Sequence, residues 1–227
     1  MAVDFFANGL CFYCDMAIKD LDGYRDFQSR LEMLWKNEDK SLQEEIDNVL
    51  RSRSDLDEQD VIDSYAWELH LHQSRFPEIH RSALVISLFV FLENQLNGLC
   101  HLLGRSMASN VSVEDVAGKG VERAFKYMSK VAQFDLGKVS RIAFLKDVNS
   151  LRNRLVHADG VLPEDEKNQL NRFVSKMPGL IGWPGKNVGI GSEFIDHLID
   201  EFCKFFEELN AEISPFMSRV NQGNGEA

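Results

Sequence analysis

The chain has 227 residues, of which 44% are hydrophobic and 27% are charged. This composition excludes disordered and collagen-like chains, and the length suits one domain that buries its own core. With 25 basic against 36 acidic side chains the net charge is −11, which argues against a broad basic surface for nucleic acid but leaves room for a small basic pocket.

The cysteines and the apolar segments indicate the compartment. Four cysteines are too few and too scattered for a disulfide framework, and reduced thiols are typical of the cytoplasm. The N-terminal stretch lacks the basic start of a signal peptide, and polar residues interrupt its apolar ones. The longest apolar run, residues 83–92, is too short to span a bilayer. We therefore expect a cytoplasmic protein with no membrane partner.

Apolar residues recur at helical spacing along nearly the whole chain, which predicts an all-α helical bundle. In the N-terminal half we expect Pro77 to break the helical pattern and the strongly apolar helix after it to lie at the centre of the bundle. The helices expected in this half span residues 24–37, 41–52, 57–74 and 78–107.

In the C-terminal half, Ser112 with Asp115 three positions later predicts the N-cap of a helix, and Gly160 predicts a helix end. The Gly- and Pro-rich segment 178–191 predicts a short hairpin or an ordered loop. The other expected elements are helices over 113–134, 140–160 and 192–213 and a short helix starting at Pro163. The expected organisation is an N-terminal helical region over 1–76, a bundle over 77–213 and a flexible tail over 214–227.

The segment SLRNRLVHADG, residues 150–160, places several polar side chains near one helix end. At 100° per residue, its apolar residues form one stripe that must face the core. Asn153 and His157 are four apart and share the opposite face, while Arg152 lies between the two faces. Arginine binds a phosphate through a fork of donors and histidine transfers protons near neutral pH, so the pair suits phosphate chemistry. The alternative is a set of solvated residues that interact with the helix dipole.

This segment resembles the signature of the HEPN superfamily, in which an Arg, often followed by Asn, is separated from a His by four to six residues. The long apolar helix carrying Glu93 also resembles an early helix of that family. The resemblance covers about residues 77–213, with motif support around 80–100 and 150–160. For Glu93 two interpretations are open: the carboxylate pairs with Arg152 and orients it, or it marks where the helix emerges into water.

The resemblance implies a homodimer that brings two copies of the motif into one cleft and cleaves RNA without a metal or other cofactor. Arg152 would hold the phosphate, His157 would act as general acid or base, and Asn153 would orient one of them. Attack by the 2′-hydroxyl would leave 2′,3′-cyclic phosphate and 5′-hydroxyl ends. Family members often act as toxins or in antiviral defence, sometimes beside a nucleotidyltransferase antitoxin. The alternatives are a HEPN-like module that binds RNA, a nucleotide or a protein without cleaving it, and a structural protein with a coincidental motif.

Few basic side chains lie on or near this helix to hold RNA outside the motif. They are Lys138, Arg141, Lys146 and Arg154.

Two other patterns have ligand-like spacing. Cys11 and Cys14 form a Cys-x-x-Cys pair, but no second pair accompanies them, so we interpret them as thiols packed on a helix. Glu68 and His72 share a helix face but lack a third ligand at helical spacing, so we interpret them as surface residues. We expect no metal site.

Overall fold

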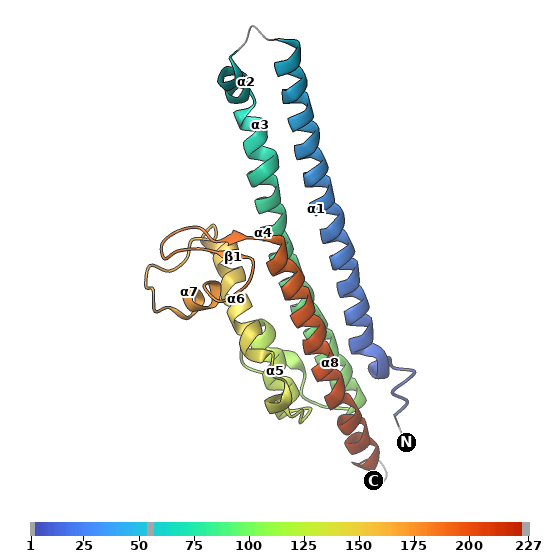
Figure 1. Ribbon diagram of the computed structural model, residues 1–227. Coiled ribbons are helices and arrows are strands. Elements are labelled where there is room, and N and C mark those ends of the chain that lie inside the picture. The colour runs from blue at the N-terminus through green and yellow to red at the C-terminus, as the bar shows by residue number, and fades with distance from the viewer. Residues whose placement is uncertain (1–2, 54–56, 224–227) are drawn as a thin grey trace.

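The computed structural model describes residues 3–53 and 57–223, and it confirms an all-α bundle with one short hairpin. A one-turn 3-10 helix, η1 (Leu10–Phe12), leads into α1 (Tyr13–Ser52). Figure 1 shows α1 beside α4 (Phe76–Ser106) and α8 (Ser192–Gly223), while residues 107–191 form a smaller lobe on the side of α4 away from α1.

Helix α1 is continuous, although two helices over 24–37 and 41–52 were expected. The polar residues 37–40 that separate the two apolar patterns resemble a loop in sequence. In the structure three of these four residues are exposed, so the helix passes through them without having to bury them. A long polar helix face is stable when the opposite face packs on neighbouring helices. Along α1 those neighbours are α8, α4 and the helical segment that precedes α4, and at this point Asp39 accepts a hydrogen bond from Gln73 of that segment.

Pro77 does not break the helical path, so the expected break is wrong. Helices α2 (Glu58–Ser64) and α3 (Ala66–His70) are followed by a π-helical turn, η2 (Leu71–Arg75), and then directly by α4. Pro77 lies in the first turn of α4, where its missing N–H and fixed φ are tolerated. A π-turn just before it widens the backbone and relieves the clash that a proline causes in a regular helix.

The segment Ala66–Ser106 is helical throughout and has the length and apolar composition that would also suit a membrane span. The same features are typical of the core helix of a soluble bundle, and α4 contributes many fully buried residues to the main core. The expected central position of this helix is confirmed. The boundary expected after residue 76 falls inside this helical segment.

The helix expected over 113–134 starts later than predicted. Ser112 and Asp115 do form a capping box, but it closes only the 3-10 turn η3 (Val113–Asp115). Gly118 and Gly120 then have φ of +127° and +51°, which an α-helix does not allow. Helix α5 therefore runs from Gly120 to Lys130. A second 3-10 turn, η4 (Leu136–Lys138), precedes α6 (Ile142–His157).

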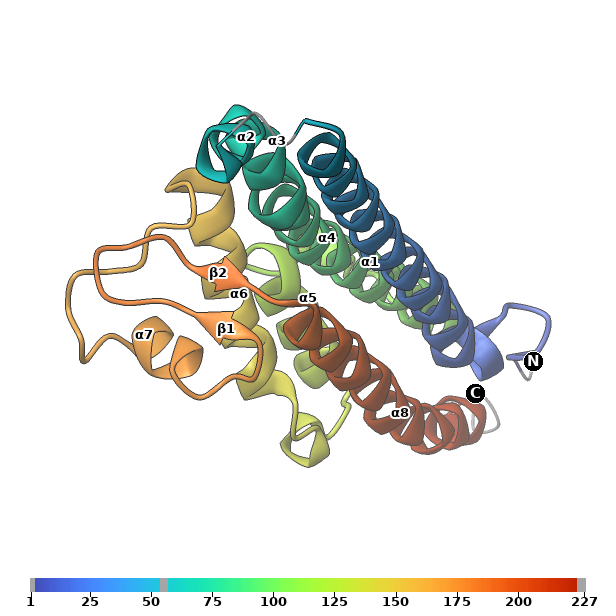
Figure 2. The same ribbon diagram turned by 45° about the horizontal axis from the view of Figure 1, so that its top comes forward.

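The chain then forms α7 (Gln169–Val174) and the antiparallel hairpin of β1 (Leu180–Ile181) and β2 (Gly189–Ile190). Helix α7 starts after an Asn168 cap and not at Pro163 as expected. Figure 2 shows this hairpin and α7 beside α6. Helix α8 continues past the expected tail boundary as far as Gly223, because Phe216 is buried and holds its last turns on the core.

Candidate functional site

Helix α6 presents the motif as the sequence predicts. Val148 and Leu151 are fully buried, so the apolar stripe faces the core. Arg152 is half-buried, whereas Asn153 and His157 are exposed. The polar side chains therefore lie on the solvent side of the last turns of α6.

Arg152 packs on α4. Its guanidinium carbon lies 5.9 Å from the centre of the buried Phe89 ring, and its Nη2 lies 3.6 Å from Glu93 Oε2. Phe89 and Glu93 are four residues apart on α4, so one helix face supplies both contacts. Of the two interpretations of Glu93, the ion pair with Arg152 is the one that the structure contains. Phe89 was not predicted, because its contact with Arg152 arises from the packing of two helices.

The donors of Arg152 are only partly used. Its Nη1 donates to Asn153 Oδ1 at 3.0 Å, whereas its buried Nε has no hydrogen-bond partner within the described residues. At 3.6 Å the Glu93 contact is an ion pair without a hydrogen bond of normal length. Nη2 is not among the buried atoms and makes no hydrogen bond of normal length within the described residues, so this nitrogen can still bind an oxyanion.

Glu93 also lies beside the first residue of α5. A Cβ placed on Gly120 would collide with Glu93 Oε1, and the φ of +51° at Gly120 favours glycine in any case. The start of α5 is therefore close to the carboxylate, where the positive end of the helix dipole stabilises it. Sequence reasoning missed Gly120. The one signal was a pair of glycines inside an expected helix.

His157 is the last residue of α6. In the turn after it, the amides of Ala158 and Gly160 both donate to the Arg154 carbonyl, at 2.9 and 3.0 Å. Gly160 has a φ of +74°. Gly160 thus ends the helix as predicted. The His157 imidazole has neither a hydrogen bond nor an ion pair in the part of the chain described.

Arg152 and His157 of the same helix α6 do not point toward one common position. Five positions separate them, so they differ by about 140° around the helix axis and about 7.5 Å along it. Val156 lies on the surface between them and is 45% exposed.

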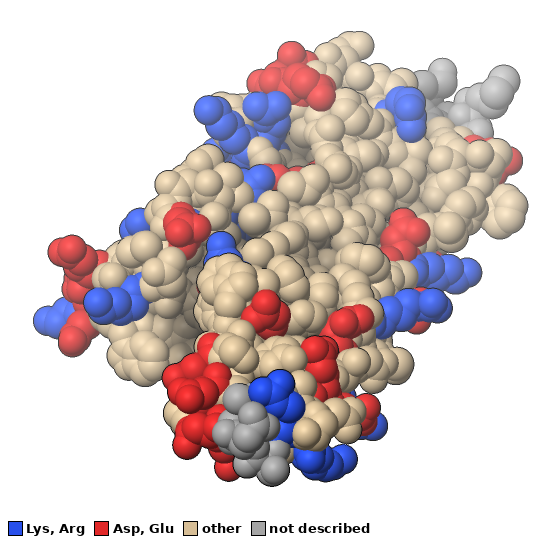
Figure 3. Space-filling model, turned by 90° about the horizontal axis from the view of Figure 1, so that it is seen from above, with Lys and Arg blue, Asp and Glu red and all other residues tan. Residues whose placement is uncertain are grey.

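The basic residues expected to support the motif separate into two groups. Arg141 pairs with Glu201 at 3.1 Å and Glu208 at 2.8 Å, and Lys138 lies 3.8 Å from Glu212, so carboxylates of α8 occupy both cations. Lys146 and Arg154 have no ion pair within residues 3–53 and 57–223. On the face drawn in Figure 3, the described Lys and Arg side chains lie in small separate groups and form no continuous basic surface.

The other ligand-like patterns do not assemble a site. Burial raises the pKa of the Cys14 thiol to about 12, which keeps it protonated, and Cys11 lies 3.7 Å from the Met217 sulfur. No three His, Cys, Asp or Glu side chains among the described residues are close enough to hold a metal ion.

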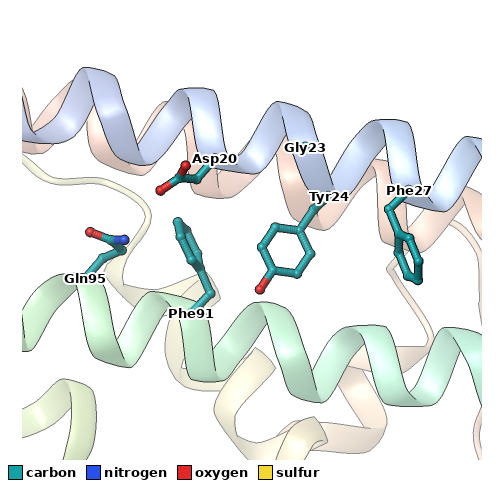
Figure 4. Close-up of a pocket in the computed structure, with 6 residues that line it drawn as sticks. All are labelled: Asp20, Gly23, Tyr24, Phe27, Phe91 and Gln95. Carbon is teal, nitrogen blue, oxygen red and sulfur yellow. The ribbon is translucent and has the colours of Figure 1, made fainter.

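A groove of about 440 Å³ lies between α1 and α4 (Figure 4). The Tyr24 and Phe91 rings form its wall with centres 5.5 Å apart, and Phe27 lies at one end. Asp20 and Gln95 supply the polar groups at its other end. Neither Arg152 nor His157 lines this groove, so it is a separate feature of the α1–α4 face.

Comparison with known proteins gives no match for this chain, whether among family models, curated proteins or solved structures.

Proposed function

We propose that the protein is a metal-independent endoribonuclease of HEPN type that acts as a homodimer. The observation that supports this most is the state of Arg152. It is held against Phe89 and Glu93, yet its Nη2 makes no hydrogen bond of normal length within the described residues, at the same helix end as His157, which has no partner there. A structural arginine in a half-buried position normally uses its donors. A phosphate-binding arginine keeps them for the substrate.

In the proposed reaction the ribose 2′-hydroxyl attacks the adjacent phosphorus and the 5′-oxygen leaves. His157 takes the hydroxyl proton or supplies a proton to the leaving oxygen, and Arg152 stabilises the charge that builds on the phosphoryl oxygens. Asn153 accepts a hydrogen bond from Arg152 and orients the guanidinium. The products are a 2′,3′-cyclic phosphate and a 5′-hydroxyl, and the atoms balance without water.

A dimer is part of this proposal, because the angle between Arg152 and His157 favours a site built from two chains. Val156 supplies an apolar contact for a two-fold axis that pairs each Arg152 with the partner subunit's histidine. The cellular role that accompanies this proposal is a cytoplasmic toxin or antiviral effector, restrained by an antitoxin such as a nucleotidyltransferase.

A second candidate is a HEPN-like dimer that binds RNA, a nucleotide or a protein without cleaving it. It is favoured by the engagement of Lys138 and Arg141 with carboxylates of α8, which leaves few cations to hold a long RNA. Both candidates use the α6 end. Only turnover distinguishes them.

The test is cleavage of end-labelled RNA by the purified protein in EDTA, with analysis of the product ends. We expect cyclic phosphate ends, and a rate at least about 100-fold lower in Arg152→Ala and in His157→Ala. His101→Ala is the matched control, since His101 is also exposed on a helix, where it contacts Asn97 and Glu114. Folded variants that cleave as fast as the parent would exclude a nuclease site built on Arg152 and His157. A folded dimer that binds RNA without cleaving it would favour the second candidate.

A further inference from the structure

Trp183 is a large aromatic side chain that the fold leaves in solvent. It is 66% exposed and lies in the loop between β1 and β2, two residues after Ile181, which is 63% exposed. Its indole has no ring contact, cation contact or hydrogen bond within the described residues. Packing inside this chain therefore gives no reason for a tryptophan at this position.

The backbone under Trp183 is fixed by its sequence. Residues 183–186 are Trp-Pro-Gly-Lys, with proline and glycine at the two central positions that a type II turn prefers. Gly185 has a φ of +72°, and Lys186 N donates to the Trp183 carbonyl at 3.0 Å. In such a turn the Cα atoms of the first and fourth residues lie within about 7 Å of each other. The side chains of Trp183 and the exposed Lys186 are therefore attached to the same rigid turn.

The same turn is attached to the end of α6. Segment 185–188 forms a short ladder with segment 160–162, which begins three residues after His157. Asn187 Nδ2 also donates to the Asp159 carbonyl at 2.6 Å. The ladder bonds join Leu162 N to the Lys186 carbonyl (2.9 Å), Gly185 N to the Leu162 carbonyl (3.2 Å) and Val188 N to the Gly160 carbonyl (3.0 Å).

This attachment limits the separation between the tryptophan and the motif. Backbone spacings along the path through residues 159 and 187 put Trp183 on the order of 20 Å or less from His157. A single strand held at both points would fit the site sizes of about 4–16 nucleotides that single-strand-binding folds use.

We propose that Trp183 is a stacking platform for one base of single-stranded RNA, with Lys186 beside the adjacent phosphate. The inference rests on the proposed function and adds that the substrate is unpaired. The exposed large apolar side chains of the described hairpin segment are Ile181 and Trp183, and two side chains present far less area than a protein interface buries, whereas one indole matches the face of one base. Bases in a duplex are already stacked, so only an unpaired base is available to the indole.

The test uses the His157→Ala protein, which leaves RNA intact, and a fluorescein-labelled single-stranded RNA of about 12 nucleotides. Trp183→Ala in this background is expected to weaken binding about tenfold, while Trp183→Phe retains most of the affinity because phenylalanine also stacks. Trp67→Ala is the matched control, because Trp67 is 64% exposed on α3. Bound RNA should quench the tryptophan fluorescence of the Trp67→Phe protein but not of the Trp183→Phe protein.

The outcomes separate the two proposals. RNA bound equally well by the Trp183→Ala and the parent proteins would overturn the platform and leave the nuclease intact. No binding of single-stranded RNA by the parent protein would overturn the platform and the proposed function together. In the active chain, Trp183→Ala should raise KM and leave kcat unchanged, since the indole holds substrate away from the reacting phosphate. A change in kcat alone would contradict the platform.

Discussion

Arg152 is held by a ring face, a carboxylate and a neighbouring amide, and each contact uses a different property of the guanidinium. The guanidinium lies over the Phe89 ring, attracts Glu93 by its charge and donates one N–H to Asn153. The side chain of Arg152 is 22% exposed and that of Glu93 28% exposed, so water screens the ion pair only in part. A lysine would provide only the charge.

We therefore expect Arg152→Lys to be damaging although it conserves charge. Loss of the guanidinium contact with Phe89 should lower the free energy of unfolding by about 1 kcal/mol, and loss of the fork of donors should lower the cleavage rate about tenfold or more. Urea unfolding and single-turnover cleavage measure the two effects. The control is Arg154→Lys, two positions away and without an ion pair among the described residues. If Arg152→Lys and Arg154→Lys change the free energy of unfolding and the cleavage rate equally, Arg152 has no special role.

His80 predicts a pH dependence of stability. Burial lowers the pKa of His80, and Arg81 adds to this while Glu32 opposes it. The neutral ring accepts a hydrogen bond at Nδ1 from Trp35 Nε1, at 3.4 Å. Because the pKa is lower in the folded state, the contribution is present above the unfolded value of about 6.5 and is lost as pH falls through the folded value.

The free energy of unfolding should therefore decline as the pH falls below about 6.5, before carboxylates titrate. His80→Asn keeps an acceptor for Trp35 but does not titrate, so its stability should be flatter over this range. Urea unfolding at several pH values measures both proteins. If the two curves run parallel, His80 does not contribute the slope.

At the scale of the elements, alanine substitutions at Gly120 and Gly23 test whether each helix needs a glycine at that position. A side chain at Gly120 would need a φ of +51° and would displace Glu93, so Gly120→Ala should lower stability by about 1–2 kcal/mol. Gly23 lies inside α1 with open space where a Cβ would be, so Gly23→Ala should raise stability by about 0.5–1 kcal/mol. Thermal unfolding compares them. A shift of the same sign in both would contradict this account of the start of α5.

Helical periodicity was sufficient to predict the class, the central apolar helix and the C-terminal end of α6. It failed where a boundary depends on backbone geometry or on a neighbour. The helix expected from residue 113 starts at Gly120 because Gly118 and Gly120 have positive φ, and Pro77 is tolerated because η2 precedes it.

The site shows the same limit. Spacing along α6 predicted which side chains share a face, but Phe89 under Arg152 and Gly120 beside Glu93 depend on how α4 and α5 pack against it.

At the scale of the whole molecule, the proposed site can be tested by mixing two inactive proteins. If each site takes Arg152 from one chain and His157 from the other, a heterodimer of Arg152→Ala and His157→Ala chains contains one intact site. Random reassociation should then restore about one quarter of the parent activity. Val156→Glu, which places a charge at the proposed contact, should weaken the dimer and prevent this recovery. An inactive mixture of proven heterodimers would show that each site lies within one chain.

Helix α1 has a consequence for how the molecule opens. It is about 60 Å long, yet its buried residues are concentrated near its start, with only Ile46 buried beyond Gln28. The far half meets α2, α3 and η2 through polar contacts such as Tyr65 to Glu45 and Gln73 to Asp39. In hydrogen exchange, amides of the first turns should exchange only by global unfolding, and those near residue 50 by local opening. We therefore expect this single continuous helix to open as two cooperative units.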